Sequence, residues 1–179
     1  MFYLLSVQGQ NRTGIVADVT RLLYESQINI LDSSMTTLRS EFAMMLVISL
    51  PENASKKEFS EELNRLSNQG LSAFLRPLSE SEACHSNAEA ISNYSLSVIG
   101  QDRTGIIHHF SRLVAGLGAN IIDLNTRLMD QTEPPLYAMI LELYVPENIS
   151  KAELDSSIQT VAEQLEVDAH CHMIASIEI

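Results

Sequence analysis

The feature that most constrains this chain is an internal repeat. Residues 9–15 read GQNRTGI, and residues 100–106, which lie 91 positions later, read GQDRTGI. The same offset aligns Asp32 with Asp123, and after a short insertion in the second copy the alignment continues at an offset of 95. A match that holds its register over this distance predicts two copies of one structural unit, each of roughly 80 residues.

The first copy carries the hydrophobic patterns of alternating strands and helices. Short apolar and β-branched runs predict strands, and apolar residues spaced three and four apart predict amphipathic helices. In order, we expect a strand over 2–8, a helix of about 14 residues from Thr13, strands over 28–38 and 42–50, a helix capped by Ser55 with Glu58 in a capping box, and a strand over 71–78.

The second copy repeats this order. We expect strands over 94–99, 121–129, 136–145 and 167–177, helices over 104–117 and after the cap Ser150, and a hairpin lengthened by the proline-containing segment 130–135. A repeated βαββαβ order predicts ferredoxin-like units of the α+β class, each an antiparallel four-stranded sheet with two helices on one face. The expected boundaries are 1–78 for the first domain, 79–93 for a linker without apolar periodicity, and 94–179 for the second domain.

Charge and composition exclude several classes of function. The net charge of −12 repels a phosphate backbone, so we expect no direct binding to nucleic acid. No apolar run approaches the roughly 20 residues that span a bilayer, and the N-terminus lacks the basic region of a signal peptide. We therefore expect a cytoplasmic protein that does not associate with membranes. Cys84 and Cys171 are expected to be reduced and unpaired there.

The small size of each copy favours assembly. A domain of about 80 residues buries little core on its own, and an uncovered sheet edge is a template for pairing. A homodimer is the expected assembly.

The loop from Gly9 to Gly14, which joins a strand to a helix, is the best candidate for a binding site. Glycine permits positive φ and close backbone approach, and the first turn of a helix presents N–H groups with a partial positive charge. A carboxylate suits this environment, Arg12 or Arg103 offers a bidentate partner for it, and Asn11 or Asp102 offers oxygen acceptors for an ammonium group. Alternatively, Asn11 and Asp102 cap the helices and the glycines only shape the turn.

Polar residues at the start of the next strand extend the candidate site. Asn29 and Asp32 recur as Asn120 and Asp123. We expect them to lie close to the loop because they begin the neighbouring strand. The aspartates are candidates for holding a ligand amino group, although hydrogen bonds to the loop backbone explain them equally well.

The doubled motif resembles that of the ACT domain, a small-molecule regulatory module of amino-acid metabolism. The resemblance rests on Gly-Gln-(Asn/Asp)-Arg-Thr-Gly-Ile at a strand-to-helix turn, followed fifteen residues later by Asn-Ile-x-Asp. Two such domains fill the chain, which is similar in this to the glycine cleavage system transcriptional repressor group. The resemblance implies an amino-acid site, with glycine or serine favoured, formed by Asn11, Arg12, Thr13, Gly14, Ile15, Asn29 and Asp32 and by Asp102, Arg103, Thr104, Gly105, Ile106, Asn120 and Asp123.

The resemblance also implies a function. It indicates a cytoplasmic transcriptional regulator that acts through a protein partner such as a transcription factor, that is not an enzyme and that uses no cofactor. Two alternatives remain open: a regulatory module detached from a metabolic enzyme such as a formyltetrahydrofolate deformylase, or a dimerisation module without ligand. The departure Asn11, where the second copy has Asp102, suggests that one of the two sites is weakened.

Other reactive side chains carry weaker signals. His108 and His109 are adjacent on a helix and point about 100° apart, and His170 and His172 share a strand face without a third ligand nearby. We therefore expect no metal site. No nucleophile elbow, Walker loop or Cys-x-x-Cys motif occurs.

Overall fold

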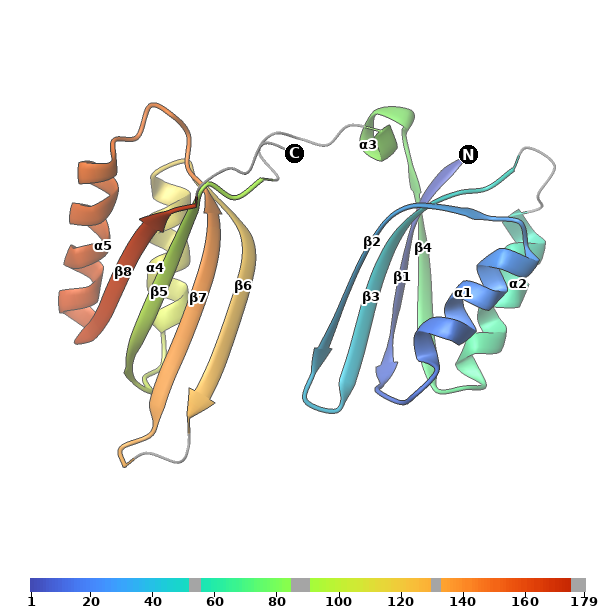
Figure 1. Cartoon of the computed structure of the whole chain (residues 1–179), viewed down its shortest axis with the longest axis horizontal. Coiled ribbons are helices and arrows are strands. Elements are labelled where there is room, and N and C mark those ends of the chain that lie inside the picture. The colour runs from blue at the N-terminus through green and yellow to red at the C-terminus, as the bar shows by residue number, and fades with distance from the viewer. Residues whose placement is uncertain (52–55, 85–90, 130–132, 175–179) are drawn as a thin grey trace. The chain divides into compact units, whose positions relative to one another are not determined.

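The computed structural model describes residues 1–51, 56–84, 91–129 and 133–174. The chain divides into two compact units, Met1–His85 and Ser86–Ile179. In each unit, two long helices cover one face of a four-stranded antiparallel sheet (Figure 1). The predicted α+β class and the two ferredoxin-like units are confirmed.

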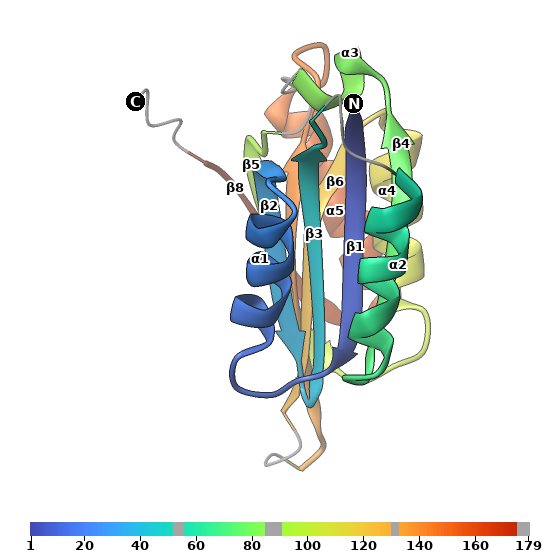
Figure 2. The same ribbon diagram turned by 90° about the vertical axis from the view of Figure 1, so that its right-hand side faces the viewer.

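The first unit contains, in order, β1 (Phe2–Gln10), α1 (Ile15–Glu25), β2 (Asn29–Leu38), β3 (Glu41–Ser49), α2 (Lys56–Ser67), β4 (Leu71–Leu78) and the short helix α3 (Glu80–Cys84). Its sheet has the order β2-β3-β1-β4, so β1 is central and β2 is an edge strand (Figure 2). Strand β1 pairs antiparallel with both β3 and β4.

The second unit contains β5 (Tyr94–Gln101), α4 (Ile106–Gly116), β6 (Asn120–Met129), β7 (Leu136–Tyr144), α5 (Lys151–Leu165) and β8 (Val167–Met173). Its sheet order, β6-β7-β5-β8, repeats that of the first unit. Strands β2 and β6 each shift register by one residue near their start, between Ile30 and Asp32 and between Ile121 and Asp123. The duplication therefore extends to a β-bulge at the same position.

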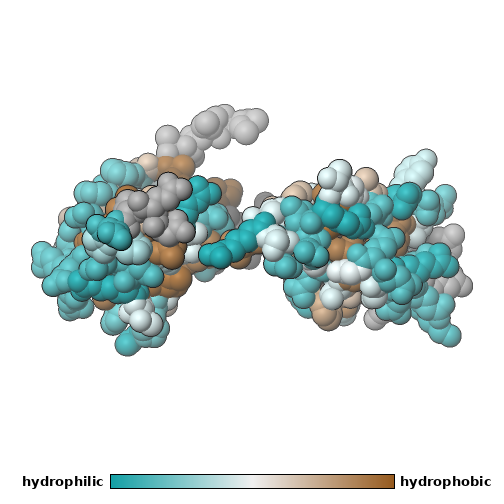
Figure 3. All heavy atoms as spheres, turned by 90° about the horizontal axis from the view of Figure 1, so that it is seen from below, coloured by the Kyte–Doolittle hydropathy of each residue, from teal (hydrophilic) through white to brown (hydrophobic). Residues whose placement is uncertain are grey.

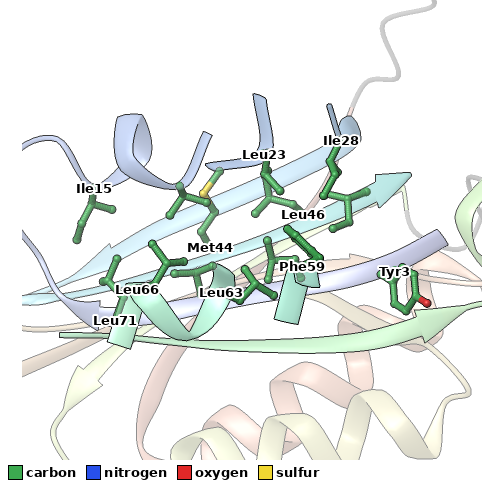
Figure 4. Close-up of a cluster of buried hydrophobic side chains, with 14 of the residues drawn as sticks. Tyr3, Ile15, Leu23, Ile28, Met44, Leu46, Phe59, Leu63, Leu66 and Leu71 are labelled. Atoms are coloured by element: carbon green, nitrogen blue, oxygen red, sulfur yellow. The ribbon is translucent and has the colours of Figure 1, made fainter. Parts of the chain in front are cut away.

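Strict alternation of side chains along the strands builds the two cores. In β1, Tyr3, Leu5 and Val7 are buried beneath the helices, and in α1 the four-residue spacing of Val19 and Leu23 places both on the sheet. Figure 4 shows Tyr3 and Leu23 within this core. The opposite face of the first sheet has no helix, and Met45 and Phe74 on it are 53% and 61% exposed. The second core is built in the same way around Leu96, Val98, Phe110, Leu141 and Leu154.

Several predicted boundaries are wrong by a few residues. Helices α1 and α4 begin at Ile15 and Ile106, two residues later than expected, because the glycine before each has a left-handed backbone, with φ of 89° at Gly14 and 101° at Gly105. Strand β8 ends at Met173, and residues 175–177 of the strand predicted over 167–177 lie outside the described residues. The predicted cap residue 55 also lies outside them.

Helix α3 lies in the segment predicted to be a linker. Ser79 and Glu82 form a reciprocal capping box: Oε2 of Glu82 accepts from the Ser79 N–H at 2.8 Å, and Oγ of Ser79 accepts from the Glu82 N–H at 3.3 Å. Hydrogen bonds from Ser79 and Arg76 lower the pKa of Glu82 to about 2. The Ser-x-x-Glu signal was present in the sequence, but it was missed because no apolar periodicity follows it.

The first glycine of each motif is required by packing. A Cβ on Gly9 would lie 2.5 Å from the carbonyl oxygen of Gly70, just before β4, and a Cβ on Gly100 would lie 2.5 Å from Cγ1 of Val167 in β8. Both distances are far below van der Waals contact, so only glycine allows the last strand to lie this close to the central strand.

Among the described residues, no helix is both long and apolar enough to cross a membrane.

Replacing Gly100 with alanine is expected to destabilise the second unit by about 1–3 kcal/mol, because the new methyl group overpacks against Val167. The matched control is Gly116→Ala in the same unit, where a Cβ meets no atom within 4 Å and alanine favours the helix by about 0.5–1 kcal/mol. Urea unfolding of the two variants measures both effects. Equal changes in the two midpoints would contradict the packing explanation.

The thiol of Cys171, which is buried against the second core, gives a pH-dependent stability. Burial raises its pKa from 9.0 to about 11, aided by Asp155. The contribution of the thiol to the free energy of unfolding is therefore constant below pH 9. It is lost as the pH rises from about 9 to 11, because the thiol ionises first in the unfolded chain. In a Cys84→Ser background, the unfolding free energy is expected to fall more steeply over this range than in the further variant Cys171→Val. Parallel curves would contradict the expectation.

Candidate functional site

The two motif loops lie at the end of each sheet where the central strand stops. The Asn11 N–H donates to the carbonyl of Ser40 at 2.7 Å, and the Asp102 N–H donates to the carbonyl of Pro135 at 3.3 Å. Each loop is therefore tied to the turn between the next two strands. In the view of Figure 3, the surface of each unit is mostly hydrophilic and is interrupted by hydrophobic patches.

The N-termini of α1 and α4 are not capped by side chains. Gly14 and Gly105 occupy the N-cap positions, and no side chain makes a capping hydrogen bond to either helix. The alternative that Asn11 and Asp102 cap these helices is therefore wrong. The N–H groups of both first turns face the loop with their partial positive charge.

In the first unit, Arg12 is held by its own unit. Its Nη2 lies 2.8 Å from Oδ2 of Asp18, in the first turn of α1, and 3.1 Å from Oε1 of Gln69, just before β4. Asp18 also pairs with Arg21 at 3.1 Å. The carboxylate of Asp18 offsets both the positive charge of Arg12 and that of the helix N-terminus, which makes this loop less attractive to an anion.

In the second unit, the arginine has a different partner. Nη2 of Arg103 donates to Oε2 of Glu166, which ends α5 and precedes β8. The counterpart of Asp18 is His109, and the first turn of α4 contains no acid. The ring of His109 lies beside Gly105, 3.5 Å from where a Cβ would stand. The negative charge near this loop therefore comes from the exposed Glu166 and Asp102 rather than from the helix itself.

The isoleucines of the motif belong to the cores. Ile15 and Ile106 are each 2% exposed, so a ligand in the loop would meet their backbone and not their side chains. Thr13 and Thr104 are exposed in the turns before the helices, and the carbonyl of Thr13 accepts from Nη1 of Arg12 at 3.4 Å. The expected loop residues are thus brought together, but the isoleucine side chains face inward.

The expectation that the strand-start residues lie beside the loop is wrong. Strand β2 is parallel to β1 and separated from it by β3, so its first residue, Asn29, pairs with Ser49 at the end of the sheet opposite the loop. Asp32 lies at that end as well, and Asn120 and Asp123 occupy the same place in the second unit. Neighbours in the chain are not neighbours in this sheet, which is the physical reason for the error.

Local hydrogen bonds occupy the two aspartates. Oδ1 of Asp32 accepts from the Ser33 N–H at 2.7 Å, and Oδ2 of Asp123 accepts from Nδ2 of Asn125 at 2.6 Å. These contacts stabilise the bulged strand starts. Neither expected role, holding a ligand amino group beside the loop or bonding to the loop backbone, is met, because both aspartates lie at the opposite end of the sheet.

A hollow of about 370 Å³ lies against the second loop, lined by Arg103, Gly105, Ile106, Ile107, His108 and Tyr137. Tyr137 and His108 were not predicted as site residues. Tyr137 pairs with Gly100 across β5 and β7, so only the strand register brings it to the loop. The rings of His108 and His109 lie edge to face at 5.6 Å, and the described part of the chain holds no group of three or more His, Cys, Asp or Glu residues suited to a metal ion.

Comparison with known proteins shows which families have sequences similar to this chain. The profile of the ACT domain matches residues 2–74. A UPF0237 protein of Methanocaldococcus jannaschii is 40% identical over 76 residues, which cover 42% of this chain and 73% of that protein. A UPF0237 protein of Lactococcus lactis subsp. lactis is 37% identical over 62 residues, which cover 35% of this chain and 70% of that protein.

Two solved structures match almost the whole chain. An unknown protein from Galdieria sulphuraria has a TM-score of 0.77 at 26% identity, with coverage of 97% of this chain and 98% of that chain. A candidate glycine cleavage system transcriptional repressor has a TM-score of 0.69 at 20% identity, with 98% of both chains covered. The second likeness is one of fold.

Replacing Asp18 with asparagine is expected to lower the free energy of unfolding by about 1 kcal/mol, because it removes two ion pairs and an acid at a helix N-terminus. The control is Glu61→Gln, which removes an exposed carboxylate 4.0 Å from Lys57 and is expected to cost under about 0.5 kcal/mol. Denaturant unfolding at low and high salt measures both. If Asp18→Asn lowers the free energy of unfolding no more than Glu61→Gln does, the stabilising role given to Asp18 is contradicted.

Proposed function

Because this chain belongs to the ACT-domain family and, within it, to the UPF0237 proteins, we propose that it is an amino-acid-responsive regulatory protein. The observation that carries the proposal is the doubled loop, in which an uncapped helix N-terminus and an arginine occur together. Backbone N–H groups and a guanidinium are the two groups that recognise a carboxylate best.

The proposed ligand is a small amino acid, with glycine or serine favoured by the family resemblance. Its carboxylate would bind the N–H groups of the first helical turn and the loop arginine, and its ammonium group would bind Asp102 in the second unit or Asn11 in the first. The second loop is the stronger candidate, since it has the hollow beside Arg103 and lacks the competing acid that α1 carries.

The proposed readout is contact with another protein. In this proposal the chain is a cytoplasmic transcriptional regulator of glycine cleavage or of amino-acid metabolism more broadly, it is not an enzyme, and it works as a homodimer through a partner such as a transcription factor. The net charge of −12 supports a protein partner over direct contact with DNA.

Isothermal titration of the purified protein with glycine, serine and the other common amino acids tests the proposal. Saturable binding of one of them is expected, and Arg103→Ala is expected to weaken it at least about tenfold, as for the loss of a charge-assisted hydrogen bond. The matched control is Arg112→Ala, which removes the same charge from the exposed side of α4 outside the loop and should leave the affinity unchanged.

Two results would contradict the proposal. Absence of saturable heat with every amino acid would favour a dimerisation module without ligand. Equal losses in Arg103→Ala and Arg112→Ala would show that the charge of the unit matters and the loop does not.

A further inference from the structure

The face of the first sheet that carries no helix, which we call the open face, has its side chains arranged in rows across the four strands. The strand registers place Phe74, Ser6, Met45 and Ser34 in one row, from β4 across β1 and β3 to β2. Phe74 and Met45 are 61% and 53% exposed. This central row therefore alternates large apolar and small polar side chains.

The next row of the open face carries opposite charges at its two ends. It reads Arg76, Leu4, Val47 and Asp32, again from β4 to β2. The two charges stand on opposite edges of the sheet, with two aliphatic side chains between them. Arg76 donates through Nη1 to Glu82 at 3.1 Å, and its guanidinium carries further donors.

We propose that a second copy of this chain packs on the open face, about a two-fold axis parallel to the strands and midway between β1 and β3. Rotation about this axis reverses the order of the strands, so each row faces the same row of the partner read in the opposite direction. Phe74 then meets the small Ser34 of the partner subunit, and Met45 meets the partner's Ser6. In the next row, Arg76 meets the partner's Asp32, and each sheet presents both halves of the ion pair.

A third row fits the same operation. Ser72, Gln8, Ala43 and Thr36 follow the central row towards the loops and line a hollow of about 430 Å³. On reversal, the long side chain of Gln8 meets the small Ala43 of the partner subunit and enters this hollow. Three successive rows are thus complementary to themselves, which is the property that a two-fold interface requires.

The size of the face suits a dimer of modest affinity. Four strands about 4.8 Å apart and about 30 Å long present roughly 500 Å² per copy, or roughly 1,000 Å² in total. This is the lower bound for specific interfaces, and stacked sheets pack about 10 Å apart at about −30°, so the fit is best near the central row.

Charge favours this face over others as the interface between two copies. Each copy has a net charge of −12, so most surfaces repel their counterpart. The three rows of the open face contain one acid and one base, Asp32 and Arg76. The matching face of the second sheet carries Glu142, Asp168 and His170 among its exposed or half-buried residues, and burial of these groups costs more.

The proposal goes beyond amino-acid binding and is tested by sedimentation of the full chain over a range of concentrations. A monomer–dimer equilibrium is expected, and Phe74→Ser is expected to raise its dissociation constant about tenfold or more. The control is Tyr24→Ser, which removes another exposed aromatic, 83% exposed on α1, and should leave the equilibrium unchanged. Amino-acid titration of Phe74→Ser separates the two proposals, since its loops are intact.

A charge exchange tests the axis itself. Asp32→Lys sets two positive charges against each other and is expected to weaken the dimer, whereas Asp32→Lys combined with Arg76→Glu restores the pair in reverse and recovers it. A wild type that stays monomeric at all concentrations overturns the proposal, as does a dimer that Phe74→Ser leaves intact. Protection of Phe74 from solvent that does not depend on protein concentration also overturns the proposal, because something other than a second copy then covers the open face.

Discussion

The close contact between the central strand and the start of the last strand organises each unit. Gly9 lies against the backbone of Gly70, and Gly100 lies against Val167. Because these contacts leave no room for a side chain, the turn before the last strand is brought beside the motif loop. In the first unit Gln69, two residues before β4, contacts the loop arginine, and in the second unit Glu166, directly before β8, does so. One packing constraint therefore decides the electrostatic surroundings of both candidate sites.

The two units share a scaffold but differ in charge. Sheet order, bulge position and the left-handed glycine before the first helix are the same in both. Asp18 in the first unit and His109 in the second occupy equivalent helical positions, and they give the two helix N-termini different fields. Duplication of this kind keeps one backbone while the charge around each loop changes.

Much of the fold was predictable from local pattern, and the errors have physical causes. The strands and long helices follow from alternation and from four-residue spacing, as in β1 and α1. The place of Asn29 and Asp32 was predicted wrongly because strand order in the sheet differs from order in the chain. The partners of the arginines were not predictable, since Gln69 and Glu166 lie 57 and 63 residues away from them. Tyr137 reaches the second loop through strand register alone.

The contact between Arg103 and Glu166 has a consequence for how the proposed site would respond. Glu166 adopts a left-handed backbone with φ of 52°, a conformation that costs a residue other than glycine about 1 kcal/mol. In the first unit the corresponding turn has a glycine, Gly70, in this conformation. A carboxylate that binds Arg103 competes with Glu166 for the Nη2 donor and shares the remaining guanidinium donors with it. Such competition would raise the amino-acid concentration at which the proposed site fills, by a modest factor because the ion pair is exposed.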